Sequence, residues 1–140
     1  MKLVIDTNII IAAMVKDGLA RKIIFFGNVD LISPEFTMEE VYKHRDIILD
    51  KAHFTEEEFR ILFLTILGRV KIIPKSRYIS FLREADSLIG KIDYKDVPFL
   101  ALSLAVRNDG VWSDDKHFKK QNKIRVLTTK EIIGSIQKIS

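Results

Sequence analysis

The chain begins with MKLVIDTNII (residues 1–10), in which a short apolar strand runs directly into three polar residues, Asp6, Thr7 and Asn8. Residues 3–5 are apolar without alternation, which is typical of a parallel strand that is buried on both faces. A polar residue at the end of such a strand is either the N-cap of the next helix or part of a functional site. The stretch alone leaves both interpretations open.

Helix and strand signals alternate along the rest of the chain. This alternation predicts an α/β domain, a three-layer α/β/α sandwich with a central, largely parallel sheet. The expected strands are 2–5, 31–32, 70–74, 111–113 and 124–127. The expected helices are 9–15, 19–26, 34–48, 55–67, 76–88, 96–109 and 128–139. Thr55 and Glu58 have the spacing of a capping box at the start of the fourth helix.

Length and composition limit the class of protein. We expect a single domain over residues 1–140, because this length suits one hydrophobic core. The absence of cysteine excludes disulfides, thiolate metal sites and cysteine nucleophiles, which leaves oxygen and imidazole ligands. The formal charge of +4 agrees with a polyanionic partner without requiring one. Because neither a signal-like leader nor a membrane-length apolar run is present, we expect a cytoplasmic protein without membrane attachment.

Acidic residues recur where the expected strands end or where the following helices begin. They are Asp6, Glu39, Glu40, Asp93, Asp96, Asp114 and Asp115. In open α/β sheets the ligand-binding edge lies at the carboxyl ends of the strands. We therefore expect these side chains to converge at one edge of the sheet.

Each acid also has an ordinary structural explanation. Asp96 has the position of an N-cap, Asp114 and Asp115 that of a polar turn, and Glu39 and Glu40 that of a solvated helix face. Caps alone would not require acids, since Ser or Thr serve as well. Two carboxylates about 4 Å apart repel each other by ~4 kcal/mol at an effective dielectric of 20. A cluster of them therefore indicates a bound cation, and Mg²⁺ or Mn²⁺ suits oxygen ligands.

Four segments resemble the motifs of the PIN domain family, in the family's order and spacing. They are VIDTNIIIAAM (4–14), PEFTMEEVYKH (34–44), DYKDVPFLALSLAV (93–106) and VWSDDKHF (111–118). The resemblance implies a PIN-like fold and a metal-dependent nuclease, usually a ribonuclease with RNA as its substrate. Many small members are VapC-like toxins of toxin–antitoxin pairs, and such a role would make a small antitoxin protein a partner.

The resemblance assigns expected roles to four acids. Asp6, Asp96 and Asp115 match family acids and are the expected metal ligands and catalytic residues. Glu40 matches the family's second acid, with Glu39 as the alternative if the frame shifts by one residue. We expect it to orient water or to bind a second ion. A metal-bound water would then attack the phosphodiester, so that no side-chain nucleophile is required.

Further residues of the motifs are expected to support the site. Asn8, Ser113, Asp93 and Asp114 are expected to hold the ligands or to position the substrate. His117 departs from the family pattern, because many members have an acid at this position. A lone histidine of this kind is interpreted as a surface or helix-end residue, and proximity to the substrate phosphate is the alternative.

Two other classes of protein also place acids at strand exits. A haloacid-dehalogenase-like phosphohydrolase requires a second acid two residues after the first, where this chain has Asn8. A non-catalytic phospho-receiver domain has an early acid pair and a later phospho-accepting Asp, whereas the pair in this chain, Asp114 and Asp115, comes last. A non-catalytic RNA-binding α/β domain is a further alternative.

Residues 59–67 are apolar on more than one helical face. Such a helix must be buried more fully than contact with one sheet face allows. We therefore expect a homodimer contact at this helix, and a central helix buried within the monomer is the alternative.

Overall fold

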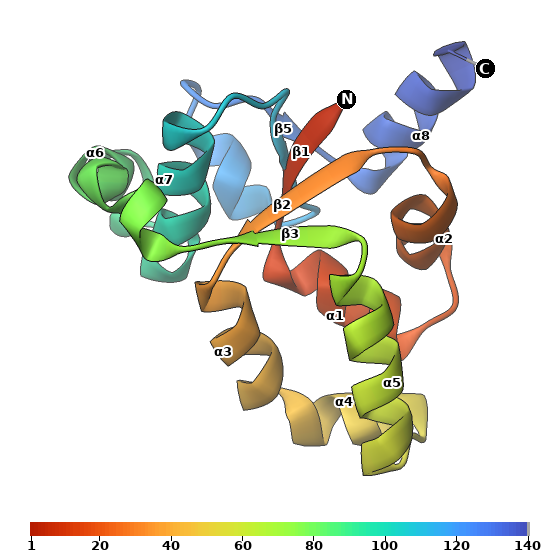
Figure 1. The fold of residues 1–140 in the computed structure, drawn as a ribbon. Coiled ribbons are helices and arrows are strands. Elements are labelled where there is room, and N and C mark those ends of the chain that lie inside the picture. Colours follow the sequence, from red (N-terminus) through yellow and green to blue (C-terminus); the bar gives the residue numbers. More distant parts are fainter. Residues whose placement is uncertain (140) are drawn as a thin grey trace.

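Residues 1–139, which the computed structural model describes, contain a five-stranded sheet in which every neighbouring pair of strands is parallel (Figure 1). The strand order is β3-β2-β1-β4-β5. The strands are β1 (Lys2–Ile5), β2 (Asp30–Pro34), β3 (Val70–Ile73), β4 (Val111–Trp112) and β5 (Val126–Leu127). The chain steps outward from β1 to β3 and then crosses to β4 and β5, so the strand order reverses at β1.

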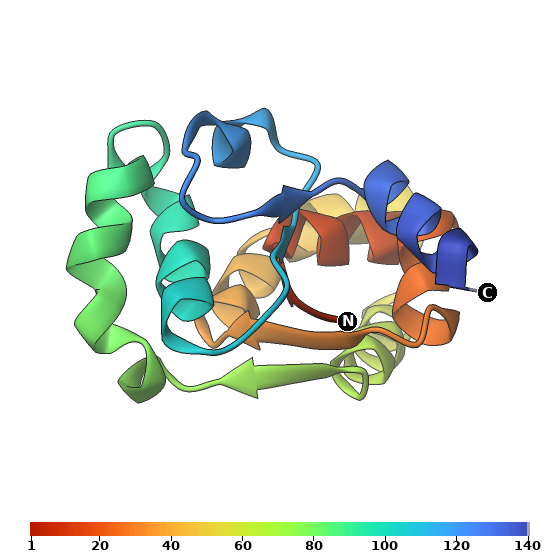
Figure 2. The same ribbon diagram turned by 90° about the horizontal axis from the view of Figure 1, so that it is seen from above.

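Helices cover both faces of this sheet. The α-helices are α1 (Thr7–Val15), α2 (Leu19–Phe26), α3 (Phe36–Lys43), α4 (Arg45–Ala52), α5 (Glu56–Leu67), α6 (Leu82–Ala85), α7 (Val97–Ala105) and α8 (Thr129–Ile139). Figure 2 shows α6 and α7 on one side of the sheet, with α1, α2 and α8 on the other. The expected three-layer α/β/α sandwich with a parallel sheet is therefore confirmed.

The hydrophobic core has two parts because successive residues of a strand point to opposite faces of the sheet. Leu3 and Ile5 pack in the cluster that includes side chains of α1 and α5. Val4 packs in the cluster that includes side chains of α6 and α7. All three side chains are fully buried, which explains why this strand is apolar without alternation.

Helix α5 begins with the capping box that the spacing of Thr55 and Glu58 predicts. The Thr55 hydroxyl accepts a hydrogen bond from the backbone N–H of Glu58 at 3.2 Å, and the Glu58 carboxylate accepts one from the backbone N–H of Thr55 at 3.1 Å. The helix ends at Leu67, and Gly68 is its C-cap. The predicted capping box is thus confirmed.

The single helix expected over residues 34–48 is wrong in two respects. Pro34 is the last residue of β2, and the helix is divided into α3 and α4. The division falls at His44, whose backbone has φ −98° and ψ 11°. The Glu40 carbonyl oxygen accepts from the backbone N–H of His44 at 3.2 Å, and the His44 ring also lies 2.8 Å from this oxygen at the end of α3.

The continuous helix expected over residues 76–88 is also wrong. This segment contains the 3₁₀ turns Lys75–Arg77 and Ile79–Phe81, the four-residue helix α6, and a π-helical turn at Asp86–Gly90. Its apolar residues keep helical spacing, and Tyr78, Ala85 and Ile89 are buried against the sheet. The pattern therefore indicated the buried side of the segment but not the type of its hydrogen bonds.

Among residues 1–139, none of the helices has both the length and the hydropathy needed to cross a membrane.

Candidate metal centre

The candidate site lies at the carboxyl ends of β1 and β4, where the strand order reverses. Asp6 follows β1, and its backbone N–H donates to the Trp112 carbonyl oxygen at 3.0 Å. Ser113 follows β4, and its backbone N–H donates to the Leu127 carbonyl oxygen at 3.1 Å. In open parallel sheets the crevice at this reversal is where ligands bind, because the loops on either side of it diverge.

The four predicted catalytic acids line one cavity of about 150 Å³. They are Asp6, Glu40, Asp96 and Asp115, and Thr7, Asn8, His44, Asp93, Lys95 and Phe99 complete the lining. The structure therefore brings together residues from four separate parts of the chain. Asn8 and Asp93, two of the predicted supporting residues, also lie in this lining.

Ser113 connects two of these acids. Its hydroxyl donates to Asp6 Oδ2 at 2.9 Å, and it accepts from the backbone N–H of Asp115 at 3.0 Å. One buried side chain thus fixes both the rotamer of Asp6 and the course of the backbone into Asp115. This is the arrangement expected for a residue that orients ligands without binding the ion itself.

The Asp6 carboxyl is only 4% exposed. Burial raises the pKa of Asp6 to about 7, and the nearby Asp115 charge adds to this effect. The Ser113 hydroxyl and the backbone N–H groups of Asn8 and Thr7 act in the opposite direction, because they favour the ionised carboxylate. Without a bound cation, ionisation of Asp6 at neutral pH is therefore opposed by its surroundings.

Asp96 is the least compensated acid of the cavity. It is 5% exposed, and its Oδ2 atom is buried without a hydrogen-bond partner. Burial is the main cause that raises the pKa of Asp96 to about 8, followed by the charge of Asp93 and then by the charges of Asp6, Asp115 and Glu40. A buried carboxylate oxygen without a partner is costly, and a cation bound to this atom would offset that cost.

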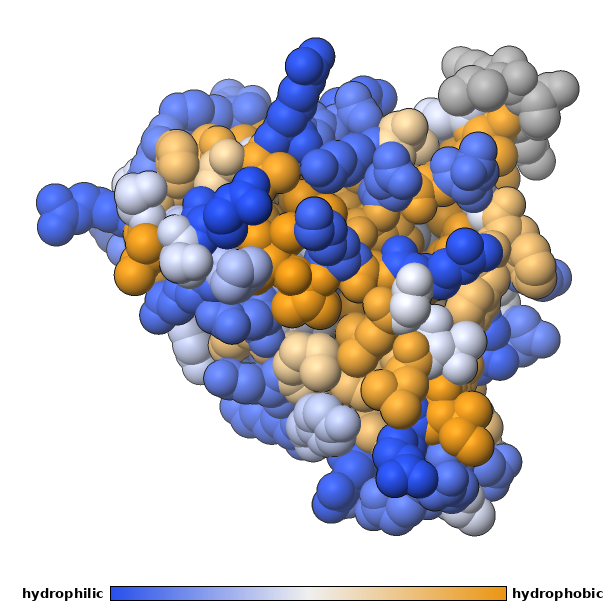
Figure 3. Space-filling view, viewed as in Figure 1, coloured by the Kyte–Doolittle hydropathy of each residue, from blue (hydrophilic) through white to orange (hydrophobic). Residues whose placement is uncertain are grey.

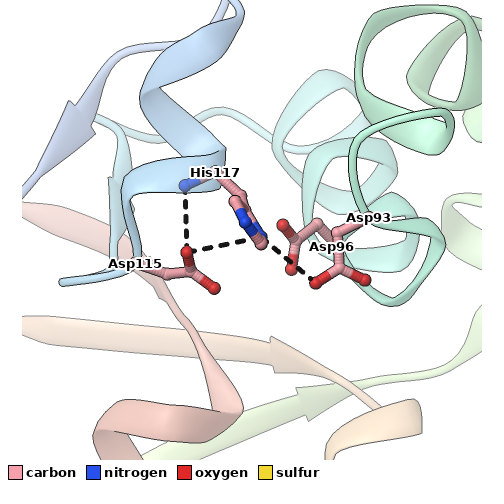
Figure 4. A group of neighbouring side chains, drawn as sticks. All are labelled: Asp93, Asp96, Asp115 and His117. Carbon is pink, nitrogen blue, oxygen red and sulfur yellow. Dashed lines mark hydrogen bonds and ion pairs between the residues drawn. The ribbon is translucent and has the colours of Figure 1, made fainter.

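Asp93 and Asp96 lie close together before α7, and the His117 ring lies between them and Asp115 (Figure 4). The Asp93 carboxylate accepts from the backbone N–H of Lys95 at 3.0 Å, and Asp115 accepts from the backbone N–H of His117 at 2.9 Å. One potential ligand atom from each of Asp93, Asp96, Asp115 and His117 lies within 4.8 Å of all the others. Two of these carboxylates are thus held in place by local backbone contacts.

The helix-cap explanation applies to some of the acids but not to the most buried ones. Asp6 and Asp96 occupy the N-cap positions of α1 and α7, and neither side chain makes a cap hydrogen bond. Asp93 and Asp115 do cap the short 3₁₀ turns that follow them. The Asp6 carboxylate also accepts from the Ser113 hydroxyl and lines the cavity, so a helix cap alone does not explain an acid at this position.

Two of the predicted residues lie outside this cavity. Both oxygens of Asp114 accept hydrogen bonds from Thr129, from its backbone N–H at 2.8 Å and from its hydroxyl at 2.7 Å, at the start of α8. Glu39 is exposed and lines adjoining hollows instead, whereas Glu40 is 8% exposed and lines the acidic cavity. The geometry therefore favours Glu40 over Glu39 as the second acid of the site.

Four residues of the cavity lining were not among the predicted site residues, namely Thr7, His44, Lys95 and Phe99. His117, which was interpreted as a surface or helix-end residue with proximity to the substrate phosphate as the alternative, lies beside Asp93 and Asp115. Lys95 lies next to Asp96 in sequence, so its proximity to the motif was a usable signal. His44 lies four residues after Glu40, which places both on one side of a helix.

A larger hollow lies at the opposite edge of the sheet, where the strands begin. It has a volume of about 790 Å³. Its lining includes Lys2, Asp30 and Val70, which are the first residues of β1, β2 and β3, and the end of α2. Asp30 is the only acid in its lining. This hollow therefore lacks the ligand chemistry that the smaller cavity has.

The donor set of the acidic cavity fits a divalent cation. Its acids line one cavity, an Asp96 oxygen has no partner, and neighbouring carboxylates add to the burial that raises the pKa of Asp6 and Asp96. Carboxylate ligands suit Mg²⁺ and Mn²⁺, which keep several water ligands and need few protein ligands. The arrangement is thus of the kind that holds a hydrated ion at a surface accessible to substrate.

Comparison with known protein families agrees with this site. The family model described as PIN domain matches residues 4–133. The chain therefore belongs to the PIN domain family. PIN domains are generally nucleases that use divalent metals. None of the curated proteins compared with the chain is a significant match.

Proposed function

We propose that this protein is a divalent-metal-dependent ribonuclease that acts as a single nuclease domain. The observation that carries the proposal is the buried, unpartnered Oδ2 atom of Asp96, which lines a cavity together with four further acids. Mg²⁺ or Mn²⁺ bound in this cavity would supply a nucleophilic water and neutralise charge on the phosphodiester.

The residues that line the cavity have different proposed roles. Asp6, Asp96 and Asp115 are the proposed ligands, and Ser113 holds two of them in register. Glu40 lines the same cavity from α3, and its proposed role is to orient the attacking water. The half-buried Lys95 supplies positive charge beside the cavity, where a phosphate would enter.

A hollow next to the acidic cavity supports a single-stranded nucleic acid as the substrate. It has a volume of about 150 Å³ and is lined by Phe36, Glu39, Glu40, Lys43, Tyr94 and Lys95. It shares Glu40 and Lys95 with the acidic cavity. Tyr94 is 70% exposed, although a large ring of this kind gains from being covered. An exposed aromatic ring between two lysines is a suitable surface for stacking a base beside the cleaved phosphate.

The proposed reaction is tested by comparing substrates in the presence of Mn²⁺. Single-stranded RNA should be cleaved, and cleavage should stop when EDTA removes the metal. Single-stranded DNA of the same sequence serves as the competing substrate. Hydrolysis of p-nitrophenyl phosphate without RNA cleavage would instead favour the phosphohydrolase, and labelling by acetyl phosphate would favour the receiver domain. RNA binding without cleavage would favour the non-catalytic RNA-binding domain.

The base-stacking role of Tyr94 is tested in the same assay. Tyr94→Ala should raise KM for RNA about 5- to 100-fold with little change in kcat, because stacking on an aromatic ring contributes about 1–3 kcal/mol per base. Phe26→Ala is a matched control, since Phe26 is 85% exposed and lines the hollow at the opposite edge of the sheet. Equal kinetics in both variants would exclude Tyr94 from substrate binding.

A biological role as a VapC-like toxin, with a small antitoxin protein as its partner, also belongs to this proposal. It is motivated by membership of the PIN domain family, in which many small members are such toxins. Inspection of the neighbouring reading frame for a small DNA-binding protein is the first test. Growth arrest on expression of the wild type, but not of Asp96→Asn, is the second.

We further propose that the protein forms a homodimer through α5. The helix is buried on one side only: Phe59 and Phe63 pack in the core, whereas Ile61 and Leu64 are 57% and 59% exposed. Figure 3 shows hydrophobic residues at the surface in the region of α5. A second copy of the same helix would cover this apolar strip, which neither the sheet nor a neighbouring helix covers.

Light scattering of the purified protein at micromolar concentration tests this contact. We expect a dimer for the wild type and a monomer for Leu64→Lys, because a lysine at the centre of the contact would bury an unpaired charge. Ile79→Lys is the control, since Ile79 is 55% exposed but lies in the layer of α6 and α7. A wild type that is monomeric at this concentration would contradict the proposed dimer contact at α5.

A further inference from the structure

His117 lies inside the carboxylate cluster of the candidate metal centre, although sequence reasoning placed it at the surface. Its Nδ1 atom is 3.5 Å from Asp93 Oδ2 and 3.5 Å from Asp115 Oδ1. The same atom is buried and has no hydrogen-bond partner, while the side chain as a whole is 44% exposed. The ring therefore turns one nitrogen toward the acids, while part of the side chain is exposed (Figure 4).

The position of this ring is fixed by its neighbours. The backbone N–H of His117 donates to Asp115, and the next residue, Phe118, is fully buried. The Phe118 ring meets Phe99 edge-on with the ring centroids 6.3 Å apart, and Phe99 itself lines the acidic cavity. A fully buried side chain directly after His117 thus holds the imidazole over the carboxylates.

The spacing of the four side chains suits a shared ion better than direct contacts among them. At 3.5 Å and without hydrogen-bond geometry, Nδ1 forms at most a weak contact with either carboxylate. The ligand atoms of Asp93, Asp96, Asp115 and His117 lie within 4.8 Å of one another. Two ligand atoms bound to one ion are about 3 to 4.4 Å apart when each bond is near 2.1 Å long. Side-chain shifts of a few tenths of an ångström would therefore bring all four ligand atoms within bonding distance of one ion.

We propose that His117 is a nitrogen ligand of the bound metal and that it makes the site select Mn²⁺ over Mg²⁺. The proposal rests on the metal-dependent function proposed above and adds a ligand and a preference to it. Imidazole nitrogen suits first-row transition ions, whereas Mg²⁺ favours carboxylate oxygens and water. Two independent observations support it. The Nδ1 atom of His117 has no hydrogen-bond partner, and neither has the Oδ2 atom of Asp96, a residue that is 95% buried and lies in the same cluster of four side chains.

Electron spin echo spectroscopy of the Mn²⁺-loaded protein tests the ligand directly, because it detects nitrogen bonded to Mn²⁺. We expect nitrogen modulation in the wild type, its loss in His117→Asp, and its retention in His53→Asn. His53 is the matched control because it is exposed at the end of α4. Bound Mn²⁺ without nitrogen modulation would overturn the inference and leave the metal site standing. Nitrogen modulation that persists in His117→Asp would assign the ligand to His44 and also overturn it.

Calorimetric titration of the same proteins with Mn²⁺ and with Mg²⁺ tests the preference. In His117→Asp the ratio of the two dissociation constants should move toward Mg²⁺ by about tenfold or more. In His117→Ala the affinity for Mn²⁺ should fall further than the affinity for Mg²⁺. If His117 served only as a positive counter-charge to the acids, His117→Ala would bind both ions more tightly, and the inference would fail. Absence of any binding by the wild type would contradict the proposed function itself.

Discussion

Asp96→Asn is expected to abolish metal-dependent RNA cleavage, with a loss of at least about 100-fold, while leaving the metal-free protein no less stable than the wild type. Activity should fall because the substitution removes a negatively charged ligand from the centre of the cavity. Stability should not fall, because the Asp96 carboxylate makes no cap hydrogen bond and ionises against the charges around it. Cleavage of RNA and thermal melting in EDTA measure the two effects.

The effect of Asp96 on stability should depend on pH. In the unfolded chain an Asp carboxyl ionises near pH 4, whereas burial and neighbouring acids raise the pKa of folded Asp96 to about 8. Between these values the folded state binds more protons than the unfolded state, so the free energy of unfolding decreases as the pH rises from 4 to 8. The metal-free wild type should lose stability over this range more steeply than Asp96→Asn does.

Asp114→Asn is the matched control for this variant. It makes the same chemical change one residue away from Asp115, but Asp114 contacts Thr129 at the start of α8 and lies outside the cavity. This variant should keep its activity, because Asp114 lies outside the cavity. Its amide oxygen can replace only one of the two acceptors of Asp114, so a loss of stability of about 1 kcal/mol is expected. If Asp96→Asn were as active as Asp114→Asn, the acids of the cavity would have to be interpreted as structural residues, such as helix caps, and not as metal ligands.

Addition of Mn²⁺ is expected to stabilise the wild type by ~2.7 kcal/mol when the free ion is at a hundred times its dissociation constant. The ion binds only the folded cavity, where it neutralises charges that repel one another without it. For a domain of this size the gain corresponds to a rise in Tm of roughly 5–10 °C. The gain should be larger at pH 8 than at pH 6, because the ion must displace protons from Asp6 and Asp96 at the lower pH.

Thermal melting with and without Mn²⁺ checks this expectation, with Asp96→Asn as the variant that should lose most of the gain. The Asp114→Asn control should keep all of it. A wild type whose melting temperature ignores both Mn²⁺ and Mg²⁺ over this concentration range would speak against a built cation site.

The fold and the convergence of the acids could be predicted because both follow from the chain's simplest patterns. A strand that is apolar on both faces has to lie inside a parallel sheet, and residues 3–5 form such a strand. Once β1 is central, the residues that follow β1 and β4 must meet at the same edge. Asp6 and Asp115 are therefore brought together by topology, however different their local sequences are.

The roles of individual acids could not be separated from sequence, because an N-cap and a ligand occupy the same position after a strand. Asp114 and Asp115 are adjacent, yet one caps α8 and the other faces the cavity. Only the direction of each side chain distinguishes them. His117 was misplaced for a related reason, since nothing local shows that the buried Phe118 holds its ring over the cluster.

The boundary between α3 and α4 could not be predicted, because the spacing of apolar residues is continuous across His44. The backbone leaves helical geometry at His44, with φ −98° and ψ 11°, although its N–H still donates to the Glu40 carbonyl oxygen. This break sets the direction in which α3 ends, and Glu40 and His44 both line the acidic cavity. The misjudged boundary therefore lies at the candidate site itself.

The most direct test of the metal centre is an anomalous difference map from crystals of the protein soaked in Mn²⁺. We expect a peak in the acidic cavity, bounded by Asp96, Asp115 and Asp6, with the Asp96 Oδ2 atom among its ligands. If a crystal soaked in saturating Mn²⁺ gave no peak in this cavity, or gave its strongest peak at the opposite edge of the sheet, the proposed metal centre would be contradicted.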